Sequence, residues 1–275
     1  MPCPWANLMI DLHCHILPGL DDGARSLEEA VEMAKIAEAE GIERIVATPH
    51  LFREDFVVED LGEIEEKRRL LTRTLETRNI HVKILRGAEV YIAHNLIDEI
   101  RKNRDFLVIN HHHYMFVEFP SNHVFSGVKE LFFELMSEGI TPIIAHPERN
   151  SVFASHPSFL YELVQLGSLV QANSGSFSGI YGRKVEQAVF LFLELHLVHF
   201  IASDGHNQRS LAPRLLEAKK RAEEILGKGE AMSLVKDNPR AVLEGKEIPY
   251  WPEALKPSKE EKRLALRIPF HKSKV

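Results

Sequence analysis

The chain has 275 residues, and its 34 Lys and Arg residues against 40 Asp and Glu residues give a formal charge of −6. Its 44% hydrophobic and 27% charged residues are typical of a globular protein and exclude a disordered or fibrous chain, while the acidic balance argues against sequence-independent nucleic-acid binding. Only Cys3 and Cys14 are present, no apolar run approaches the ~20 residues of a membrane span, and residues 1–9 lack a signal-peptide pattern, so we expect a cytoplasmic protein without disulfides.

Segments with strand and helix patterns alternate along the chain. A first strand is expected at 8–12, and Ser26 and Glu29 form a capping box for the helix that follows, which Gly41 ends. Further strands are expected at 43–47, 81–85, 106–109, 114–118, 140–145, 168–172 and 198–202. Helices are expected at 58–76, 96–101, 128–138, 157–167, 183–195, 212–226 and 230–236. This alternation predicts parallel βα units, and about seven or eight strands favour an α/β barrel, similar to a TIM barrel, over an open sheet.

Charge and proline positions divide the chain into two parts. Residues 253–275 contain seven basic and three acidic side chains, a net charge of +4, and they follow Pro249 and Pro252. We therefore expect a barrel domain over 8–250 and a basic C-terminal extension over 251–275. The extension is either a solvated charged tail or a contact for an acidic partner or an anionic membrane surface.

Histidines and carboxylates collect just after the predicted strands. His13 and His15 are two residues apart, as are Asp204 and His206, so each pair projects to one side of an extended segment. The loops after parallel strands share one face of a barrel, where residues distant in sequence converge. Imidazole and carboxylate ligands together suit Zn, Mn, Fe or Ni better than Mg or Ca, and we predict a multinuclear metal site. The candidate ligands are His13, His15, Asp22, His50, Glu89, Glu118, His146, Asp204 and His206.

Other candidate groups fit a catalytic role less well. The histidines at 111–113 precede a predicted strand, so we expect them at the opposite mouth of the barrel as surface residues. Cys14 lacks the arginine that a cysteine-phosphatase loop has six positions later, since Leu20 stands there. The serines within 173–179 lack the GxSxG pattern of a serine hydrolase.

At these residues the sequence resembles the polymerase-and-histidinol-phosphatase (PHP) superfamily. More narrowly, it is similar to the bacterial manganese-dependent protein-tyrosine phosphatases of capsule and exopolysaccharide operons. The matching segments are IDLHCHILPGLDDGA (10–24), TPH (48–50), GAEVY (87–91), VEFP (117–120), AHPERN (145–150), QANSGSFSGIYG (171–182) and SDGHN (203–207). The sequence departs from the family at Gly205, where Ala is usual, in the residues before Met9 and in the basic tail.

The resemblance implies a distorted barrel of the PHP fold and up to three divalent ions, most typically Mn²⁺, with Fe, Zn or Ni as alternatives. It assigns the ligands to three ions. The first ion would be held by His13, His15, Glu89 and Asp204; the second by Glu89, His50 and His146; the third by Asp22, Glu118 and His206.

The implied activity is hydrolysis of phosphotyrosine in a protein by attack of metal-bound hydroxide. Arg149 would bind the equatorial phosphoryl oxygens, and His206 is a possible acid when it is not tightly metal-bound. The implied partner is an autophosphorylating tyrosine kinase of polysaccharide export. Two other enzyme functions stay open, a small-molecule phosphatase of histidinol-phosphate type and a PHP phosphodiesterase, and so does a non-enzymatic metal-bound scaffold.

Overall fold

The computed structural model describes residues 8–258 except 57, 59 and 94. Its strands are parallel and form two sheets, one with the order β1-β2-β4 and one with the order β3-β5-β6-β7-β8-β9. The strands are β1 (Met9–Cys14), β2 (Ile42–Ala47), β3 (His50–Leu51), β4 (Lys83–Arg86), β5 (Glu89–Tyr91), β6 (Tyr114–Glu118), β7 (Thr141–Ala145), β8 (Leu169–Asn173) and β9 (Phe200–Ala202). The predicted class of parallel α/β proteins is therefore confirmed.

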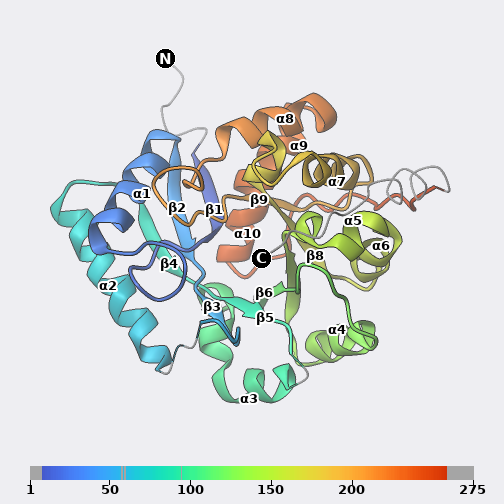
Figure 1. Cartoon of the computed structure of the whole chain (residues 1–275), viewed down its shortest axis with the longest axis horizontal. Helices are drawn as coiled ribbons and strands as arrows, with labels where there is room; N and C mark the ends of the chain where they lie inside the picture. Colours follow the sequence, from blue (N-terminus) through green and yellow to red (C-terminus); the bar gives the residue numbers. More distant parts are fainter. Residues whose placement is uncertain (1–7, 57, 59, 94, 259–275) are drawn as a thin grey trace.

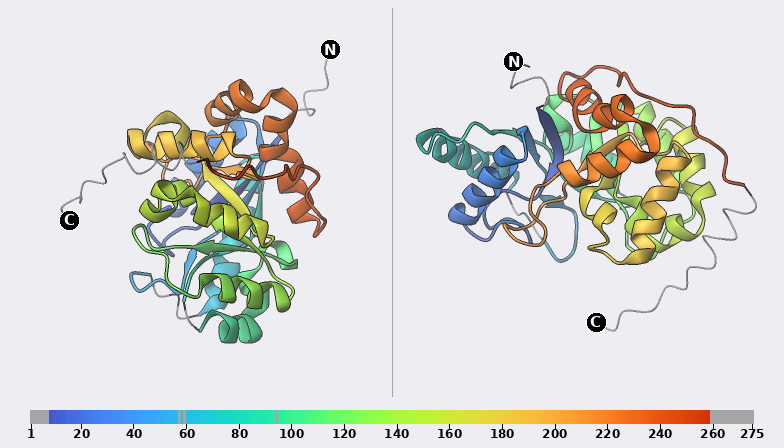
Figure 2. Two further views of the ribbon diagram at one scale, coloured as in Figure 1. Left: turned by 90° about the vertical axis from the view of Figure 1, so that its right-hand side faces the viewer. Right: turned by 90° about the horizontal axis from the view of Figure 1, so that it is seen from above.

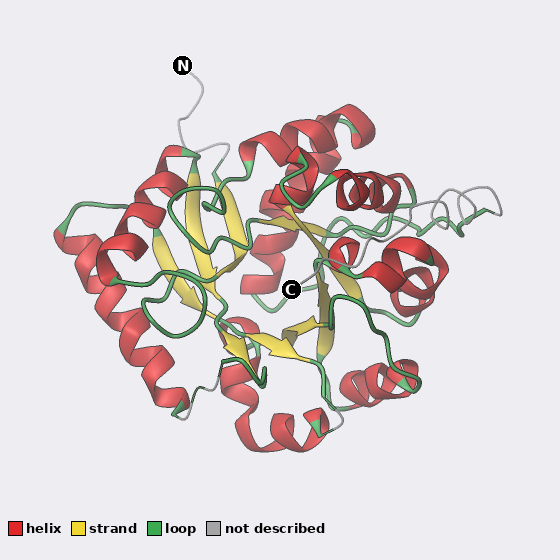
Figure 3. Ribbon diagram, viewed as in Figure 1, coloured by secondary structure: helices red, strands yellow, loops and turns green. Residues whose placement is uncertain are grey.

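Helices lie around the strands (Figure 1), and two further views show them again on the outer side (Figure 2). Figure 3 shows the strands gathered in the middle of the molecule. The helices are α1 (Leu27–Ala39), α2 (Leu61–Thr77), α3 (Leu96–Leu107), α4 (Val128–Ser137), α5 (Ser151–Ser155), α6 (Pro157–Gln165), α7 (Arg183–Glu194), α8 (Leu216–Leu226), α9 (Lys228–Met232) and α10 (Asn238–Leu243). No helix in the described part of the chain is both long and apolar enough to span a membrane.

The two sheets are joined through the backbone. Only Thr48 and Pro49 separate β2 from β3, and only Gly87 and Ala88 separate β4 from β5. A Cβ atom at Gly87 would lie 2.6 Å from the Val46 side chain, so the break between β4 and β5 requires glycine. The strand order thus continues from one sheet into the other.

At the far edge, the end of β1 meets the loop that follows β9. The Asp204 amide donates to the His13 carbonyl and the His15 amide donates to the Gly205 carbonyl, both at 2.8 Å. These bonds bring the first and last strands together at their carboxyl ends. Closure of all the strands into one barrel stays a prediction.

Most predicted elements lie close to their expected positions, and the exceptions have local causes. The strand expected at 106–109 is wrong: α3 continues to Leu107 and a 3₁₀ turn follows at Ile109–His111. Leu107, Val108 and Ile109 are all buried, so this short apolar run resembles a buried strand in sequence. The expected cap of α1 is confirmed, since the Ser26 side chain accepts from the Glu29 amide.

The first residues of the predicted C-terminal extension pack against the domain. The Trp251 ring meets the buried His199 ring edge-on, with centroids 5.7 Å apart. The Leu255 amide donates to the Leu195 carbonyl at 2.9 Å, and Ala254 is buried. The boundary at 250 stays a prediction, and residues 259–275 lie outside the described part.

Candidate metal centre

The nine candidate ligands lie together at strand ends or in the loops that follow them. Their possible ligand atoms form four overlapping sets, and within each set the atoms lie within 4.8 Å of one another. The sets are His15, Asp22, His50 and His206; His13, Glu89 and His146; His13, His15 and Asp204; and His50, Glu89 and Glu118. We call these nine residues the His–carboxylate cluster.

One part of the cluster surrounds His13 and His15, at the end of β1. The Nε2 atoms of His13 and His15 are 3.2 Å apart. Glu89 Oε2 lies 3.5 and 3.4 Å from these nitrogens, and Asp204 Oδ1 lies 3.5 and 3.3 Å from them. Neighbouring ligand atoms bound to one ion at about 2.1 Å are separated by roughly 3.0–3.4 Å. The spacing of these four side chains therefore suits a single divalent ion.

Glu89 contacts His13 and His15 as well as His50 and His146. Besides its contacts with the β1 histidines, its Oε2 lies 3.0 Å from His50 Nδ1, whereas its Oε1 lies 2.8 Å from His146 Nε2. The two oxygens thus face different histidines. This is the arrangement expected of a carboxylate shared between two ions.

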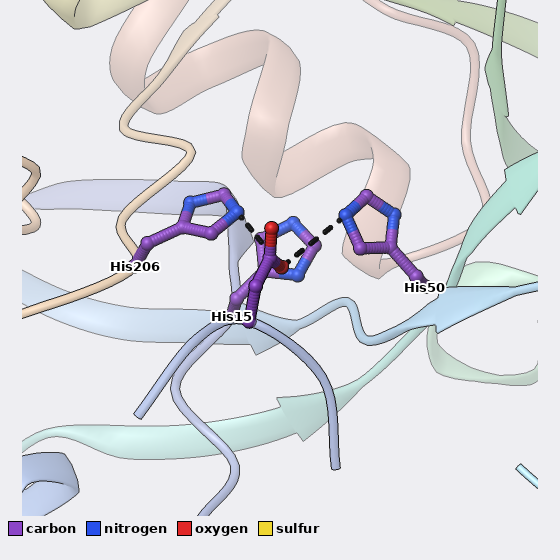
Figure 4. A group of neighbouring side chains, drawn as sticks. His15, His50 and His206 are labelled. Carbon is purple, nitrogen blue, oxygen red and sulfur yellow. Dashed lines mark ion pairs between the residues drawn. The ribbon is translucent and has the colours of Figure 1, made fainter. Parts of the chain in front are cut away.

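A third part of the cluster is centred on Asp22. Figure 4 shows His15, His50 and His206 arranged around a common centre, and the ion pairs of Asp22 Oδ1 to His50 Nε2 and His206 Nε2 measure 3.5 and 3.3 Å. Glu118 Oε2 lies 3.4 Å from His50 Nδ1. Glu118 is thereby grouped with His50 and Glu89 rather than with Asp22 and His206, which is not the grouping expected for the third ion.

Several polar atoms of the cluster are buried without a hydrogen-bond partner among the described residues. They are His50 Nδ1, Glu89 Oε2, Glu118 Oε2 and Asp204 Oδ1. A buried charged oxygen without a partner is costly, so such atoms indicate a missing neighbour. A divalent cation would supply that neighbour, and the donor set of imidazoles and carboxylates fits one.

Three histidines are oriented by hydrogen bonds from the ring nitrogen that points away from the cluster. The partners of this Nδ1 atom are Gln171 Oε1 for His13 (3.0 Å), Asp21 Oδ2 for His15 (2.7 Å) and the Asp204 carbonyl for His206 (2.8 Å). Such partners fix the tautomer and ring orientation of metal-binding histidines. The Nε2 atoms are thereby held toward the cluster.

An irregular pairing of β1 helps to aim its histidines. Asp11 is paired with Ile45 and Cys14 with Ala47, so three steps along β1 match two steps along β2. An extra residue of this kind is a β-bulge, which bends the strand and re-aims its side chains. The buried Asp11 carboxylate stabilises the distortion by accepting from the amides of His13 and Ser203.

The backbone near the cluster is strained at two of the candidate ligands. His146 has φ 31° and Asp204 has φ 52°, both in the left-handed region that non-glycine residues rarely occupy. Strain of this kind is concentrated at functional sites. Space is also limited at Gly23, where a Cβ atom would lie 2.0 Å from the His15 carbonyl oxygen.

The charged groups of the cluster shift one another's pKa values. Burial favours the neutral forms of Glu89 and Asp204, but facing histidines such as His13 outweigh it and hold both pKa values well below the usual range. Burial likewise disfavours protonated His50, yet its carboxylate neighbours raise its pKa to about 11. Protons and a divalent cation would therefore compete for the same atoms.

Arg149 lies at the edge of the cluster. Its Nη1 donates to Asp204 Oδ2 at 2.6 Å, and its guanidinium lies 4.5 Å from the centre of the Tyr181 ring. Asn173 Nδ2 donates to the same Asp204 oxygen at 2.7 Å. The Arg149 side chain remains 36% exposed, so it can also reach a bound molecule.

A cavity of about 580 Å³ opens beside the cluster. Its wall includes Glu118 and His146 of the cluster, together with Arg149. The rest of its lining consists of Phe52, Arg53, Glu54, Asp55, Tyr91, Ile92, Ala93, Phe119, Pro120, Ser121, Asn122, Ala145 and Asn150. A substrate in this cavity would have direct access to the candidate ligands.

Sequence reasoning missed several residues that contact the cluster, among them Asp21, Gln171 and Arg53. Asp21 stands beside Asp22 in the same loop, so its position could have been suspected, and Gln171 lies in a segment already noted for its resemblance. Arg53 follows His50 by three residues without any recognisable pattern. Its Nη1 donates to Glu118 Oε1 at 3.2 Å.

Cys14 and the histidines at 111–113, which the sequence did not favour as catalytic groups, do not line the cavity. Cys14 is buried, and burial raises the pKa of its thiol well above the ordinary value. The histidines at 111–113 precede β6 and so lie at the other end of this strand from Glu118. Cys3 lies outside the described residues.

Comparison with known proteins adds independent information. A model of the family described as "Capsular polysaccharide synthesis, CpsB/CapC" matches residues 9–244. The tyrosine-protein phosphatase YwqE of Bacillus subtilis is 38% identical over 202 residues, which cover 74% of this chain and 79% of that protein. The tyrosine-protein phosphatase CpsB of Streptococcus pneumoniae is 30% identical over 246 residues, covering 86% of this chain and 98% of that protein.

Solved structures give a consistent result. A crystal structure from work on YwqE of B. subtilis and CpsB of S. pneumoniae, described there as metal-dependent tyrosine phosphatases, matches with a TM-score of 0.86 and 34% identity. The match covers 91% of this chain and 100% of that one. A histidinol phosphate phosphatase from Lactococcus lactis matches with a TM-score of 0.53 and 16% identity, over 79% of this chain and 94% of that one, which shows a likeness of fold alone.

Proposed function

The chain belongs to the CpsB/CapC family of capsular polysaccharide synthesis, and from this premise we propose that it is a metal-dependent phosphatase that hydrolyses phosphotyrosine in proteins. The observation that carries the proposal is the His–carboxylate cluster, in which Glu89 faces four histidines beside an accessible cavity. The tyrosine phosphatase activity of the relatives supports the choice of phosphotyrosine, and the metal dependence of the matching structure supports a metal mechanism.

We propose that the cluster holds up to three divalent ions, with Mn²⁺ as the preferred metal. The distances around His13 and His15 support one ion, with Glu89 and Asp204 as its other ligands. The contacts of Glu89 Oε2 with His50 and of Glu89 Oε1 with His146 support a second ion that shares this carboxylate. The resemblance assigns Asp22, Glu118 and His206 to a third ion. The structure supports Asp22 and His206, which lie with His15 and His50, whereas Glu118 lies with His50 and Glu89 instead. When bound, such ions polarise phosphoryl oxygens and make water a nucleophile near neutral pH.

The chain's own side chains orient the phosphoryl group. Arg149 is held by Asp204 and by the Tyr181 ring, so its guanidinium is positioned before substrate arrives. We propose that its remaining N–H groups bind the equatorial phosphoryl oxygens, whose charge must be stabilised during transfer. His206 is only partly buried, and its Nδ1 is bonded to the Asp204 carbonyl. We propose that its Nε2 passes a proton to the departing phenolic oxygen when this nitrogen is not bound to an ion.

The natural substrate that we propose is an autophosphorylating tyrosine kinase of polysaccharide export. The family's link to capsular polysaccharide synthesis supports this choice, and the protein would then act in the cytoplasm. We also propose that the two sheets form one distorted barrel. The continuous strand order and the bonds between the end of β1 and the loop after β9 support closure.

One experiment separates the proposed function from its rivals. Turnover of a phosphotyrosine peptide, a phosphoserine peptide, histidinol phosphate and a phosphodiester is compared on one Mn²⁺-loaded preparation. We expect the phosphotyrosine peptide to give the highest kcat/KM, and chelation to abolish the activity. Preference for histidinol phosphate or the diester would assign one of the other enzyme functions, and no turnover of any ester would favour a scaffold.

A further inference from the structure

Arg53 is a second arginine beside the His–carboxylate cluster. Its Nη1 donates to Glu118 Oε1 at 3.2 Å and lies 3.2 Å from His50 Nε2. It lines the same cavity as Arg149, and its side chain is 31% exposed. Arg53 and Arg149 thus line one cavity, and they donate hydrogen bonds to different carboxylates of the cluster, Glu118 and Asp204 respectively.

The Arg53 guanidinium keeps free donor capacity. A guanidinium carries five N–H groups, and both contacts with the cluster use Nη1. The Nε atom lies 3.9 Å from Asp55 Oδ2, which is longer than a hydrogen bond, and Asp55 is highly exposed, so this pair is weak. With respect to the described residues, donors of Arg53 therefore remain for a ligand in the cavity.

Contacts with Phe56 hold the loop that carries Arg53. The Phe56 amide donates to the Arg53 carbonyl at 3.1 Å, and the guanidinium lies 5.6 Å from the centre of the Phe56 ring. The Phe56 ring in turn stacks on His50, with the ring planes 9° apart. Phe52 has φ 63°, a strained conformation for a bulky residue. These contacts hold Arg53 in place relative to the cluster.

Three aromatic side chains also line this cavity. Phe52, Tyr91 and Phe119 line it together with Arg53. Aromatic rings offer an apolar face to a phenol ring, whereas arginine offers paired N–H donors to phosphate oxygens. The cavity thus combines both kinds of contact that an aryl phosphate needs.

From this arrangement we infer that Arg53 is a substrate-binding residue that contacts the phosphoryl group in this cavity together with Arg149. The phenol ring of phosphotyrosine then lies against the aromatic side chains of Phe52, Tyr91 and Phe119. The inference rests on the proposed function, because it assigns to Arg53 a role in binding that substrate. It makes the cavity selective for aryl over alkyl phosphates.

The test compares Arg53→Ala, Arg53→Lys and the control Arg101→Ala, all loaded with Mn²⁺. Arg101 is an exposed arginine of α3 that pairs with Glu138 and does not line the cavity. Calorimetry measures the Kd of inorganic phosphate, and steady-state kinetics measures KM and kcat for a phosphotyrosine peptide and an alkyl phosphate. Metal content is measured on each sample.

We expect Arg53→Ala to weaken phosphate binding and to raise KM by about 10- to 100-fold, the loss of one or two charge-assisted hydrogen bonds. Metal content stays at the wild-type level, Arg53→Lys recovers part of the loss, and Arg101→Ala behaves as the wild type. The selectivity for aryl over alkyl phosphate should fall in Phe52→Ala.

Two results would overturn the inference. One is an unchanged phosphate Kd and KM in Arg53→Ala at full metal content. The other is a loss of metal from Arg53→Ala with normal phosphate binding once metal is restored, which would make Arg53 only a counter-ion of Glu118. Failure of the proposed function is a separate outcome, since the wild type would then bind phosphate in an Arg53-dependent manner without hydrolysing the peptide.

Discussion

Replacing Arg149 by alanine should separate phosphoryl binding from metal binding. The substitution removes a guanidinium that donates to Asp204 at 2.6 Å and packs on the Tyr181 ring. Asp204 keeps its bond from Asn173 at 2.7 Å, and its other oxygen still faces the two β1 histidines. We therefore expect metal content and fold to be retained in Arg149→Ala.

The expected loss lies in the rate. Removing one preorganised donor from a developing negative charge reduces kcat by about 10²–10³-fold, which corresponds to roughly 2.7–4 kcal/mol. Arg149→Lys should recover only part of this, because lysine keeps the charge but not the paired donors. Tyr181→Leu tests whether the Tyr181 ring positions Arg149, and it should lower kcat by less than Arg149→Ala does.

The assay measures turnover of a phosphotyrosine peptide beside metal analysis for each variant. Near-wild-type turnover in Arg149→Ala with full metal occupancy would refute the reasoning and remove Arg149 from the site. A rate loss that follows the loss of metal would instead show that Arg149 acts through Asp204. The control is Arg101→Ala, whose ion pair with Glu138 lies outside the cavity.

Three further predictions concern the cluster and the buried core. Glu89→Ala should lower both metal content and rate, because its two oxygens face different histidines; metal analysis that matches the wild type would contradict the shared carboxylate. Chelation should abolish aryl phosphate hydrolysis, and Mn²⁺ should restore it. Cys14→Ser should keep most activity, because the Cys14 thiol is buried and its raised pKa keeps it protonated. An inactive Cys14→Ser protein with wild-type metal content would argue for a thiol nucleophile. Burial lowers the pKa of His199 to about 3, so between about pH 6.5 and 3 only the unfolded state binds a proton at this residue. The free energy of unfolding therefore falls by up to ~1.4 kcal/mol per pH unit as the pH decreases through this range. Urea unfolding at several pH values should show a weaker pH dependence for His199→Asn, and the same pH dependence in both proteins would contradict the role of His199.

The sequence was sufficient to find the nine candidate ligands because simple geometry relates them. Two-residue spacing puts His13 and His15 on one side of an extended segment, as expected. The same argument is wrong for Asp204 and His206, because they lie in the turn after β9 and Asp204 has a left-handed φ of 52°. Parallel strands end at a common edge, which brings such pairs together without any knowledge of loop conformation.

Other features depend on distances that no sequence pattern contains. Strands β3 and β5 have two and three residues, too few for a periodic signal, and yet they carry His50 and Glu89. Gln171 reaches His13 from β8, a contact fixed by the packing of strands far apart in the chain. The grouping of Glu118 with His50 depends on side-chain directions at the end of β6. These features follow from three-dimensional packing and not from a local sequence pattern.

Asp204 connects the two kinds of chemistry expected at this site. Its Oδ1 faces the Nε2 atoms of His13 and His15, where an ion would bind, whereas its Oδ2 accepts from Arg149 and Asn173. A single carboxylate therefore fixes the distance between the candidate metal position and the arginine that would bind phosphate. The strained φ of 52° at this residue is consistent with such a constraint, because this backbone conformation presents both oxygens to their partners while the amide bonds to the His13 carbonyl. Preorganisation of the site is thus built into the turn that follows β9.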